Sequence, residues 1–247
     1  MDSTIQAEQL QAIGHNLLCV NEKIAQAARS VGRKPEDVQL VVVSKMHTPE
    51  SIQAAIQGGG RKFGENYAKE TVHKINQVPR VPGLEWHMIG HVQSRKARLV
   101  ADQFDMVQSV DSLKIAERLN TACEGRGRHL PVLLEINLSG EESKYGWTTQ
   151  NQDRWNELLP EIDLVVALAN LQVKGLMTMP PLFDDPEMTR PFFGLLVKFR
   201  DFLRIKIPGP DWNELSMGTS NDYEVAVQEG ATIVRVGQAI LGPRPAR

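Results

Sequence analysis

The feature that most constrains the fold of this chain is a strand-like run followed by a helical pattern, repeated along most of its length. Each parallel pair in a sheet needs a crossover connection, so this order predicts a parallel sheet in an α/β protein. Eight such units in 247 residues predict a closed (β/α)₈ barrel, the TIM barrel. An open doubly wound sheet is the main alternative, but no glycine-rich dinucleotide turn follows the first run. The eight runs are residues 38–44, 62–64, 85–89, 105–110, 131–138, 172–177, 213–217 and 232–236.

The segment before the first run predicts an extra helix. Apolar residues recur there at three- and four-residue steps, at Leu10, Ile13, Leu17, Val20 and Ile24. We expect this helix, over residues 4–32, to cover a flank or an end of the barrel. No linker or change of composition calls for a second domain, so we expect one domain over residues 1–247, with a helical extension at 1–35 and the barrel at 38–242.

The composition argues against several classes of partner. With 28 basic and 30 acidic side chains the net charge is −2, so no global field attracts nucleic acid or an anionic membrane. The basic stretch 93–98 is interpreted as a solvated helix face, because nucleic-acid binding takes a broader basic footprint. Cys19 and Cys123 lie far apart and show no metal-ligand spacing. The amino terminus lacks the pattern of a secretory signal, and the longest apolar stretch, 164–169, is too short to span a bilayer. We therefore expect a cytoplasmic protein that binds no nucleic acid, membrane or metal.

Lys45 stands at the carboxyl end of the first predicted strand. Val41, Val42 and Val43 precede it, and consecutive β-branched residues are typical of a strand buried on both faces. A lysine at such a strand end leans toward a partly desolvated mouth, where the pKa of the amine falls and the neutral form can attack a carbonyl. The alternative is a solvated lysine at a strand end, because most lysines are exposed.

Other candidate site residues lie at or near the ends of the predicted strands. In a barrel these ends share one rim, where binding sites are built. The candidates are Asn66, His87, Ser216, Met217, Gly218, Ser220, Arg235 and Gly237. Gly218 and Gly237 permit close approach of the backbone, and helices are expected just beyond them, so the last two strands predict a phosphate site. Ser220 could instead cap a helix, and Arg235 within an apolar strand needs a buried acceptor.

We expect the phosphate site to lie across the barrel from Lys45. A Schiff-base lysine facing a phosphate site suggests a ligand that carries both an aldehyde and a phosphate. Pyridoxal phosphate meets that description. A phosphorylated sugar, as handled by lysine-dependent aldolases, meets it as well.

Six segments carry a recognisable pattern: residues 43–45, 63–67, 85–90, 93–96, 216–222 and 234–242. In sequence and in order they resemble the pyridoxal-phosphate homeostasis protein family. The resemblance implies a fold-type III barrel, similar to the N-terminal domain of alanine racemase, with pyridoxal 5′-phosphate held by Lys45 as a Schiff base. It also implies that Asn66 borders the ring. The residues that it assigns to the phosphate and to the flank of the ring are Ser216, Ser220, Arg235 and Gly237.

Holding pyridoxal phosphate does not by itself make a catalyst. Racemisation needs acid–base groups on both faces of the substrate α-carbon, and fold-type III racemases supply the second group from an additional β-domain. Here the barrel pattern ends near Gly242, and we expect residues 243–247 to be only a tail. The candidates for a second base are Tyr67, His87, His91 and Tyr145. We interpret His87 as a structural histidine, His91 as a surface or ligand contact and Tyr145 as solvated.

The sequence therefore predicts a carrier without appreciable catalysis. Such a protein would keep the free aldehyde low and pass pyridoxal phosphate to apo-enzymes that depend on it. We expect a monomer rather than an obligate dimer. The first alternative is a small fold-type III enzyme, such as an amino-acid racemase, and the second is a lysine-dependent aldolase.

Overall fold

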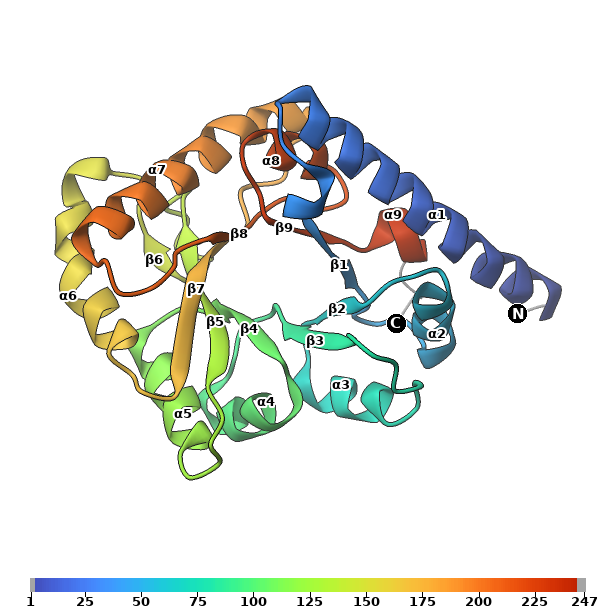
Figure 1. Ribbon diagram of the computed structural model, residues 1–247, viewed down its shortest axis with the longest axis horizontal. Helices are drawn as coiled ribbons and strands as arrows, with labels where there is room; N and C mark the ends of the chain where they lie inside the picture. Colours follow the sequence, from blue (N-terminus) through green and yellow to red (C-terminus); the bar gives the residue numbers. More distant parts are fainter. Residues whose placement is uncertain (1–2, 244–247) are drawn as a thin grey trace.

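Eight parallel strands close into a barrel in the computed structural model, which describes residues 3–243 (Figure 1). Neighbours in the ring are β1, β2, β3, β4, β5, β7, β8 and β9, and the pairs β4–β5 and β9–β1 complete the closure. This confirms the predicted barrel over the open doubly wound sheet. The bounds are β1 (Gln39–Val43), β2 (Lys62–Glu65), β3 (Glu85–Met88), β4 (Met106–Val110), β5 (Leu130–Asn137), β7 (Leu171–Thr178), β8 (Glu214–Ser216) and β9 (Ile233–Val236).

A short additional strand, β6 (Trp147–Thr148), is absent from the predicted pattern. It pairs with Ile136 and Asn137 of β5, beyond the point where β4 ends opposite Leu134. β6 therefore extends the barrel wall at the carboxyl end of β5. Two residues are too few to show a period of their own in the sequence.

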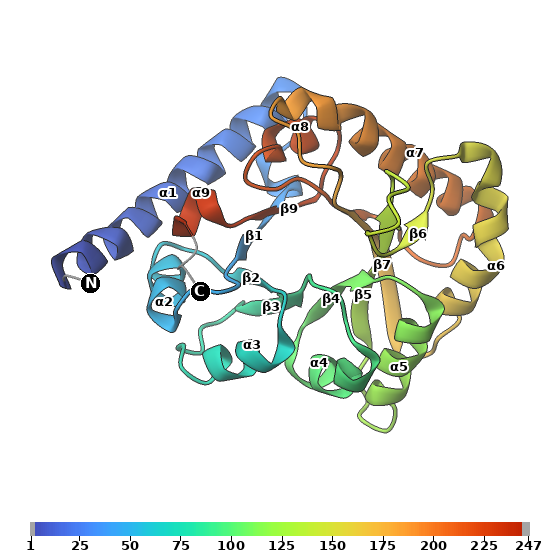
Figure 2. The same ribbon diagram turned by 180° about the vertical axis from the view of Figure 1, so that it is seen from behind.

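Helices surround the ring of strands, and Figure 2 shows the same arrangement from behind. Their bounds are α1 (Ser3–Ser30), α2 (Pro49–Gln57), α3 (Ala68–Ile75), α4 (Ala97–Gln103), α5 (Leu113–Cys123), α6 (Trp155–Val166), α7 (Arg190–Lys206), α8 (Tyr223–Gln228) and α9 (Gln238–Leu241). Thr48 caps α2, since its side chain accepts from the amide of Ser51. Ser112 occupies the N-cap position of α5, but its hydroxyl donates to Asp111 and makes no capping bond.

Apolar side chains form two separate cores. The large one lies between the strands and the helices and includes Val42, whereas a small one lies inside the barrel and includes Val41. Successive residues of a strand face opposite sides of the sheet. Val41 therefore points into the barrel and Val42 toward the helices, and this fixes the direction of the other residues of β1. The small cluster is Val41, Leu133, Met177 and Ile233, with Met106 packed against it.

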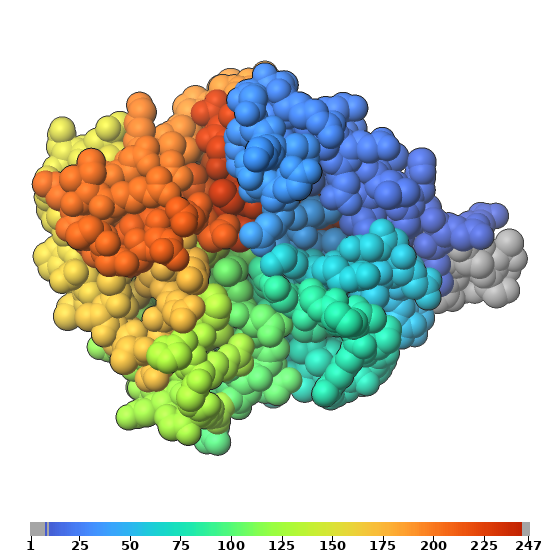
Figure 3. Space-filling view, in the orientation of Figure 1, coloured from blue at the N-terminus to red at the C-terminus, as the bar shows by residue number. Residues whose placement is uncertain are grey.

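The predicted amino-terminal helix is confirmed as α1, which packs on α2, α8 and α9. In Figure 3 it lies in blue beside the red carboxyl-terminal segments. Residues 244–247 of the predicted tail lie outside the described residues. Within residues 3–243, no helix combines the length and the apolar character that crossing a membrane requires.

Candidate functional site

Lys45 lies two residues after the end of β1, on the rim formed by the carboxyl ends of the strands. Its side chain is partly buried, and continuing the alternation from Val41 places it on the interior side of the barrel. The next residue, Met46, has a φ of 66°, in the left-handed region that residues other than glycine rarely adopt. Lys45 therefore belongs to a tight turn at the mouth of the barrel.

A buried ion cluster lies behind this turn, toward the helices. Lys74 Nζ of α3 donates to Ser44 O and to Glu65 Oε1, both at 2.8 Å. It also pairs with Glu70 Oε1 at 2.6 Å, while Ser44 Oγ donates to Glu65 Oε1 at 2.8 Å. Lys74 is only 4% exposed and Glu65 is fully buried. Glu70 and Lys74 are recognisable in the sequence as an i,i+4 pair. Because such pairs are typical of exposed helix faces, the sequence did not predict that these two residues lie at the site.

The end of β2 carries two neighbouring acceptors that lack a hydrogen-bond partner in the described part of the chain, Glu65 Oε2 and Asn66 Oδ1. Burial raises the pKa of the Glu65 carboxyl, and the charge of Lys74 opposes this shift. Asn66 is packed tightly, because a Cβ on Gly90 would lie 2.7 Å from its Cα. Of the two, Asn66 Oδ1 lies at the barrel mouth, where a donor from a ligand would satisfy it.

Arg235 begins a chain of hydrogen bonds that crosses the barrel interior. Its guanidinium donates to Ser216 Oγ at 2.5 Å and to Thr178 O at 2.8 Å. Ser216 Oγ in turn donates to Gln108 Oε1 at 2.6 Å. Arg235 therefore has the buried acceptors that the sequence predicted for it, and its bond to Ser216 Oγ orients that hydroxyl.

His87 continues the same chain and is only 1% exposed. Gln108 Nε2 lies 2.8 Å from His87 Nδ1, and Glu85 Oε2 lies 3.2 Å from His87 Nε2. Since the amide donates to Nδ1, this network assigns the imidazole proton to Nε2, which donates to Glu85. That bond, followed by the ion pair with Lys62, lowers the pKa of Glu85 to about 2. Both ring nitrogens of His87 are thus engaged within the barrel.

Ser220 and Gly237 meet at the start of α9. The amides of Gly237 and Ala239 donate to Ser220 Oγ at 3.2 and 3.4 Å, so Ser220 binds the start of α9. A Cβ on Gly237 would lie 3.1 Å from Val43 O, two residues before Lys45. The expectation that this segment lies across the barrel from Lys45 is wrong, because β9 pairs directly with β1.

Met217 and Gly218 are the two residues that follow β8. Gly218 has a φ of 90°, and a Cβ there would lie 2.5 Å from the side chain of Ala226, so only glycine suits the position. Its carbonyl accepts from the amide of Arg235 at 3.0 Å. Met217 is fully buried in the core between strands and helices, so its backbone, and not its side chain, belongs to the rim.

Glu135 of β5 adds a titratable group near Arg235. Burial raises the pKa of Glu135 to about 7, with a further rise from the charge of Asp111 and an opposing effect of Arg235. Burial lowers the pKa of Arg235 to about 10, so its guanidinium remains charged at neutral pH. A fixed cation therefore lies near a carboxyl group that titrates around neutral pH.

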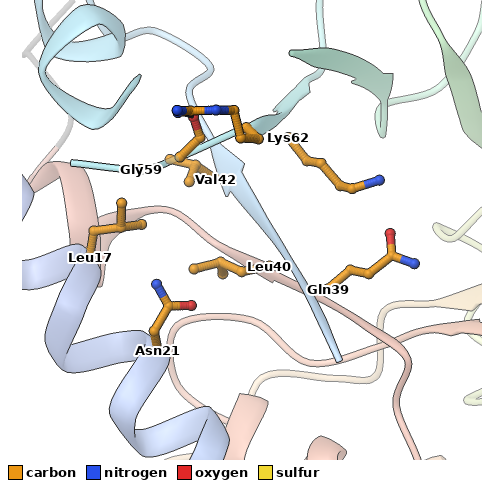
Figure 4. A pocket seen from close by; sticks show the side chains of 9 residues that line it. Leu17, Asn21, Gln39, Leu40, Val42, Gly59 and Lys62 are labelled. Atoms are coloured by element: carbon orange, nitrogen blue, oxygen red, sulfur yellow. Dashed lines mark hydrogen bonds between the residues drawn. The ribbon is translucent and has the colours of Figure 1, made fainter. Parts of the chain in front are cut away.

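The pocket in Figure 4 lies at the other end of the barrel. Gln39 and Lys62 are the first residues of β1 and β2, and they line this pocket together with Leu17 of α1. Lys45 and Asn66 follow the last residues of the same strands, so the pocket is separate from the rim. Across residues 3–243, no cluster of histidine, cysteine, aspartate or glutamate could hold a metal ion.

The rim residues suit a ligand with an aldehyde at one end and a phosphate at the other. Lys45 offers an amine, and the start of α9 offers amides that already bind one hydroxyl oxygen, as a phosphate oxygen would be bound. At Gly218 and Gly237 the backbone packs closely against Ala226 and Val43, so these turns have no room for a Cβ. Fold and site together define a class of parallel barrel whose rim carries a lysine beside amides that bind a hydroxyl oxygen.

Comparison with known proteins narrows this class. The model of the family "Alanine racemase, N-terminal domain" matches residues 9–245. The pyridoxal phosphate homeostasis protein of Escherichia coli strain K12 is 41% identical over 234 residues, which cover 94% of this chain and 97% of the relative. The protein of the same name from Vibrio alginolyticus is 39% identical, covering 95% and 99%. The chain belongs to the alanine racemase N-terminal domain family and, within it, to the pyridoxal phosphate homeostasis proteins.

Comparison with solved structures supports the same family and the same fold. PipY of Synechococcus elongatus, solved with PLP bound, has a TM-score of 0.76 and 35% identity, covering 89% of this chain and all of that chain. A protein described as unknown from Bifidobacterium adolescentis has a TM-score of 0.84 and 33% identity, covering 97% of both chains. Alanine racemase from Corynebacterium glutamicum, at 19% identity and a TM-score of 0.68, shares the fold over 94% of this chain and 61% of its own.

We predict that Lys74→Met lowers the free energy of unfolding by about 3–5 kcal/mol, because it leaves the buried Glu65 carboxylate without its cation. Urea unfolding followed by circular dichroism measures the change. Adding Glu65→Leu should recover much of the loss, since the orphaned charge is then gone. Lys23→Met, at an exposed ion pair with Glu224, is the control and should change little. Wild-type stability for Lys74→Met would contradict the role of the cluster.

We also predict a pH-dependent contribution from Glu135. Its folded pKa of about 7 lies above the ordinary 4.5, so the folded protein keeps a proton that the unfolded chain loses. The contribution to stability is therefore present below pH 4.5 and falls by about 3 kcal/mol as the pH rises toward 7. Between pH 5 and pH 7, urea unfolding should show about 2 kcal/mol of this fall in the wild type and none of it in Glu135→Gln. Parallel pH profiles for the two proteins would refute the prediction.

Proposed function

We propose that this protein is a carrier of pyridoxal phosphate that maintains the level of the free cofactor and binds it as a Schiff base at Lys45. The observation that carries the proposal is the position of the Lys45 turn beside the start of α9, on one rim. The names of the close relatives and the PLP bound in PipY support the same ligand. A phosphorylated sugar has no such support.

The residues of this chain have distinct parts in binding. Lys45 Nζ attacks only as the neutral amine, after it loses its proton. Lys45 would bind the aldehyde that the cofactor supplies, with one C=N bond formed, one C=O bond broken and one water released. Ser220 and the amides at the start of α9 would hold the phosphate. Asn66 would border the ring.

The buried residues of the site would act from below the rim. Arg235 supplies a fixed positive charge, and its bond to Ser216 Oγ holds that hydroxyl in place. His87 would shape the site through the hydrogen-bonded chain inside the barrel. Met217 and Gly218 would do so through the backbone that follows β8. Addition of water reverses the linkage, so the same rim can release the cofactor.

The side chains considered as second bases support a carrier over a racemase. His87 has both ring nitrogens engaged, and His91 Nδ1 bonds Asp111 Oδ2 at 2.6 Å. Tyr145 is stacked on His91 with ring centroids 3.9 Å apart, and Tyr67 is 46% exposed. We therefore propose that no group acts on the free face of a substrate α-carbon with enzyme-like efficiency.

The remaining features of the proposal concern the cellular setting. The carrier acts as a single-domain monomer in the cytoplasm and transfers the cofactor to apo-enzymes that need it. The basic stretch at 93–98, where Arg95 and Arg98 are exposed, serves no nucleic acid. The balanced net charge of −2 supports this view.

Titration with pyridoxal phosphate tests the proposal. The wild type should develop the yellow absorbance of lysine-bound pyridoxal, and borohydride should fix one cofactor per chain. Lys45→Ala should lose both signals, because the amine that we propose to form the Schiff base is then gone. Lys198→Ala, an exposed lysine on α7, should retain them. Equal signals in Lys45→Ala, or α-proton exchange of an amino acid at about 1 s⁻¹ or faster, would contradict the proposal.

A further inference from the structure

The turn that carries Lys45 is held at both of its ends by one cluster of side chains. On one side, Lys74 Nζ donates to Ser44 O, the carbonyl of the peptide bond that precedes Lys45. On the other side, the amide of Met46 donates to Glu70 Oε1 at 3.0 Å. Lys74 and Glu70 are themselves paired at 2.6 Å, which closes the arrangement behind the lysine.

The donors and acceptors of this cluster match in number. An ammonium group has three protons, and Lys74 Nζ has three acceptors within 2.8 Å, namely Ser44 O, Glu65 Oε1 and Glu70 Oε1. The three directions are thereby used, and the ammonium cannot turn away from any one of them without losing a charged hydrogen bond. A buried cation that is fully satisfied fixes the groups around it.

The cluster lies behind Lys45, on the side of β1 and β2 that faces the helices. Val42 of β1 and Phe63 of β2 face the helices, and two steps further along each strand come Ser44 and Glu65. Lys45 and Asn66, one residue later, face the mouth instead. Because of this alternation, Ser44 and Glu65 point toward the cluster, whereas Lys45 and Asn66 point toward the expected ligand.

The turn also needs to be held, because Met46 has a φ of 66°. A residue with a Cβ in this region costs on the order of 1 kcal/mol or more and persists where surrounding contacts enforce it. The bond from the Met46 amide to Glu70 is such a contact. Without it, the turn can relax and move the origin of the Lys45 side chain.

We propose that Glu70, Lys74 and Glu65 are positioning residues, which hold the Ser44–Met46 turn so that the Lys45 amine meets the carbonyl of a ligand anchored at α9. This inference rests on the proposed function. It goes beyond it by assigning affinity for the cofactor to three residues that do not touch the ligand. Glu70 is the member best suited to a test, because its side chain is 36% exposed and its replacement leaves the buried pair of Lys74 and Glu65 in place.

The test compares Glu70→Ala with Glu70→Gln. Alanine removes the acceptor of the Met46 amide, whereas glutamine keeps an oxygen at that position and loses only the charge. Hydrogen exchange of the Met46 amide in the cofactor-free protein should accelerate about tenfold in Glu70→Ala and stay close to the wild type in Glu70→Gln. The dissociation constant for pyridoxal phosphate, measured by absorbance, should rise about tenfold in Glu70→Ala and recover in Glu70→Gln.

The control is Glu157→Ala, which removes an exposed i,i+3 ion pair with Arg154 on the far helix α6 and should leave both readouts unchanged. Wild-type exchange and wild-type affinity in Glu70→Ala would overturn the inference. Faster exchange with unchanged affinity would overturn it as well, since the turn would then be held without consequence for binding. Absence of binding in the wild type would refute the proposed function instead, while the exchange measurement would still report on the turn.

Discussion

Closure of the sheet through the pairing of β4 with β5 is the constraint on which the rest of this structure depends. In an open sheet, strand ends would be spread along one edge, whereas closure arranges all of them around one mouth. Within the same ring the last strand, β9, pairs with the first, β1, so the start of α9 lies beside Lys45 although the two are far apart in sequence. A lysine and a set of anion-binding amides thus share one rim as a consequence of topology.

Two sets of buried polar groups meet this rim from opposite sides of β1. Inside the barrel, Arg235, Ser216, Gln108 and His87 form one hydrogen-bonded chain. Outside it, Lys74 holds the strand ends from the helix side. Buried charges are costly unless they are paired, and hydrophobic replacements are often at least as stable, so such networks are weak evidence for a gain in stability. Their position behind and below Lys45 indicates that they serve the geometry of the rim.

The sequence predicted the barrel because eight separate runs agree with one topology, and it predicted an acceptor for Arg235 because a buried guanidinium needs one. It did not reveal β6, whose two residues show no period. It also misplaced Gly237 across the barrel from Lys45, since residue order does not show that the last strand of a closed sheet adjoins the first. The role of Lys74 could not be predicted, because the sequence spacing of an i,i+4 pair is the same on a buried helix face and on a solvated one.

The central claim is that Lys45, and no other amine of this chain, captures pyridoxal phosphate beside the start of α9. Peptide mapping by mass spectrometry after borohydride reduction of the cofactor-saturated protein tests it most directly. The account predicts that the reduced cofactor is attached to the peptide that contains Lys45, with one cofactor per chain. A label distributed over several exposed lysines, or concentrated on a different one, would contradict it.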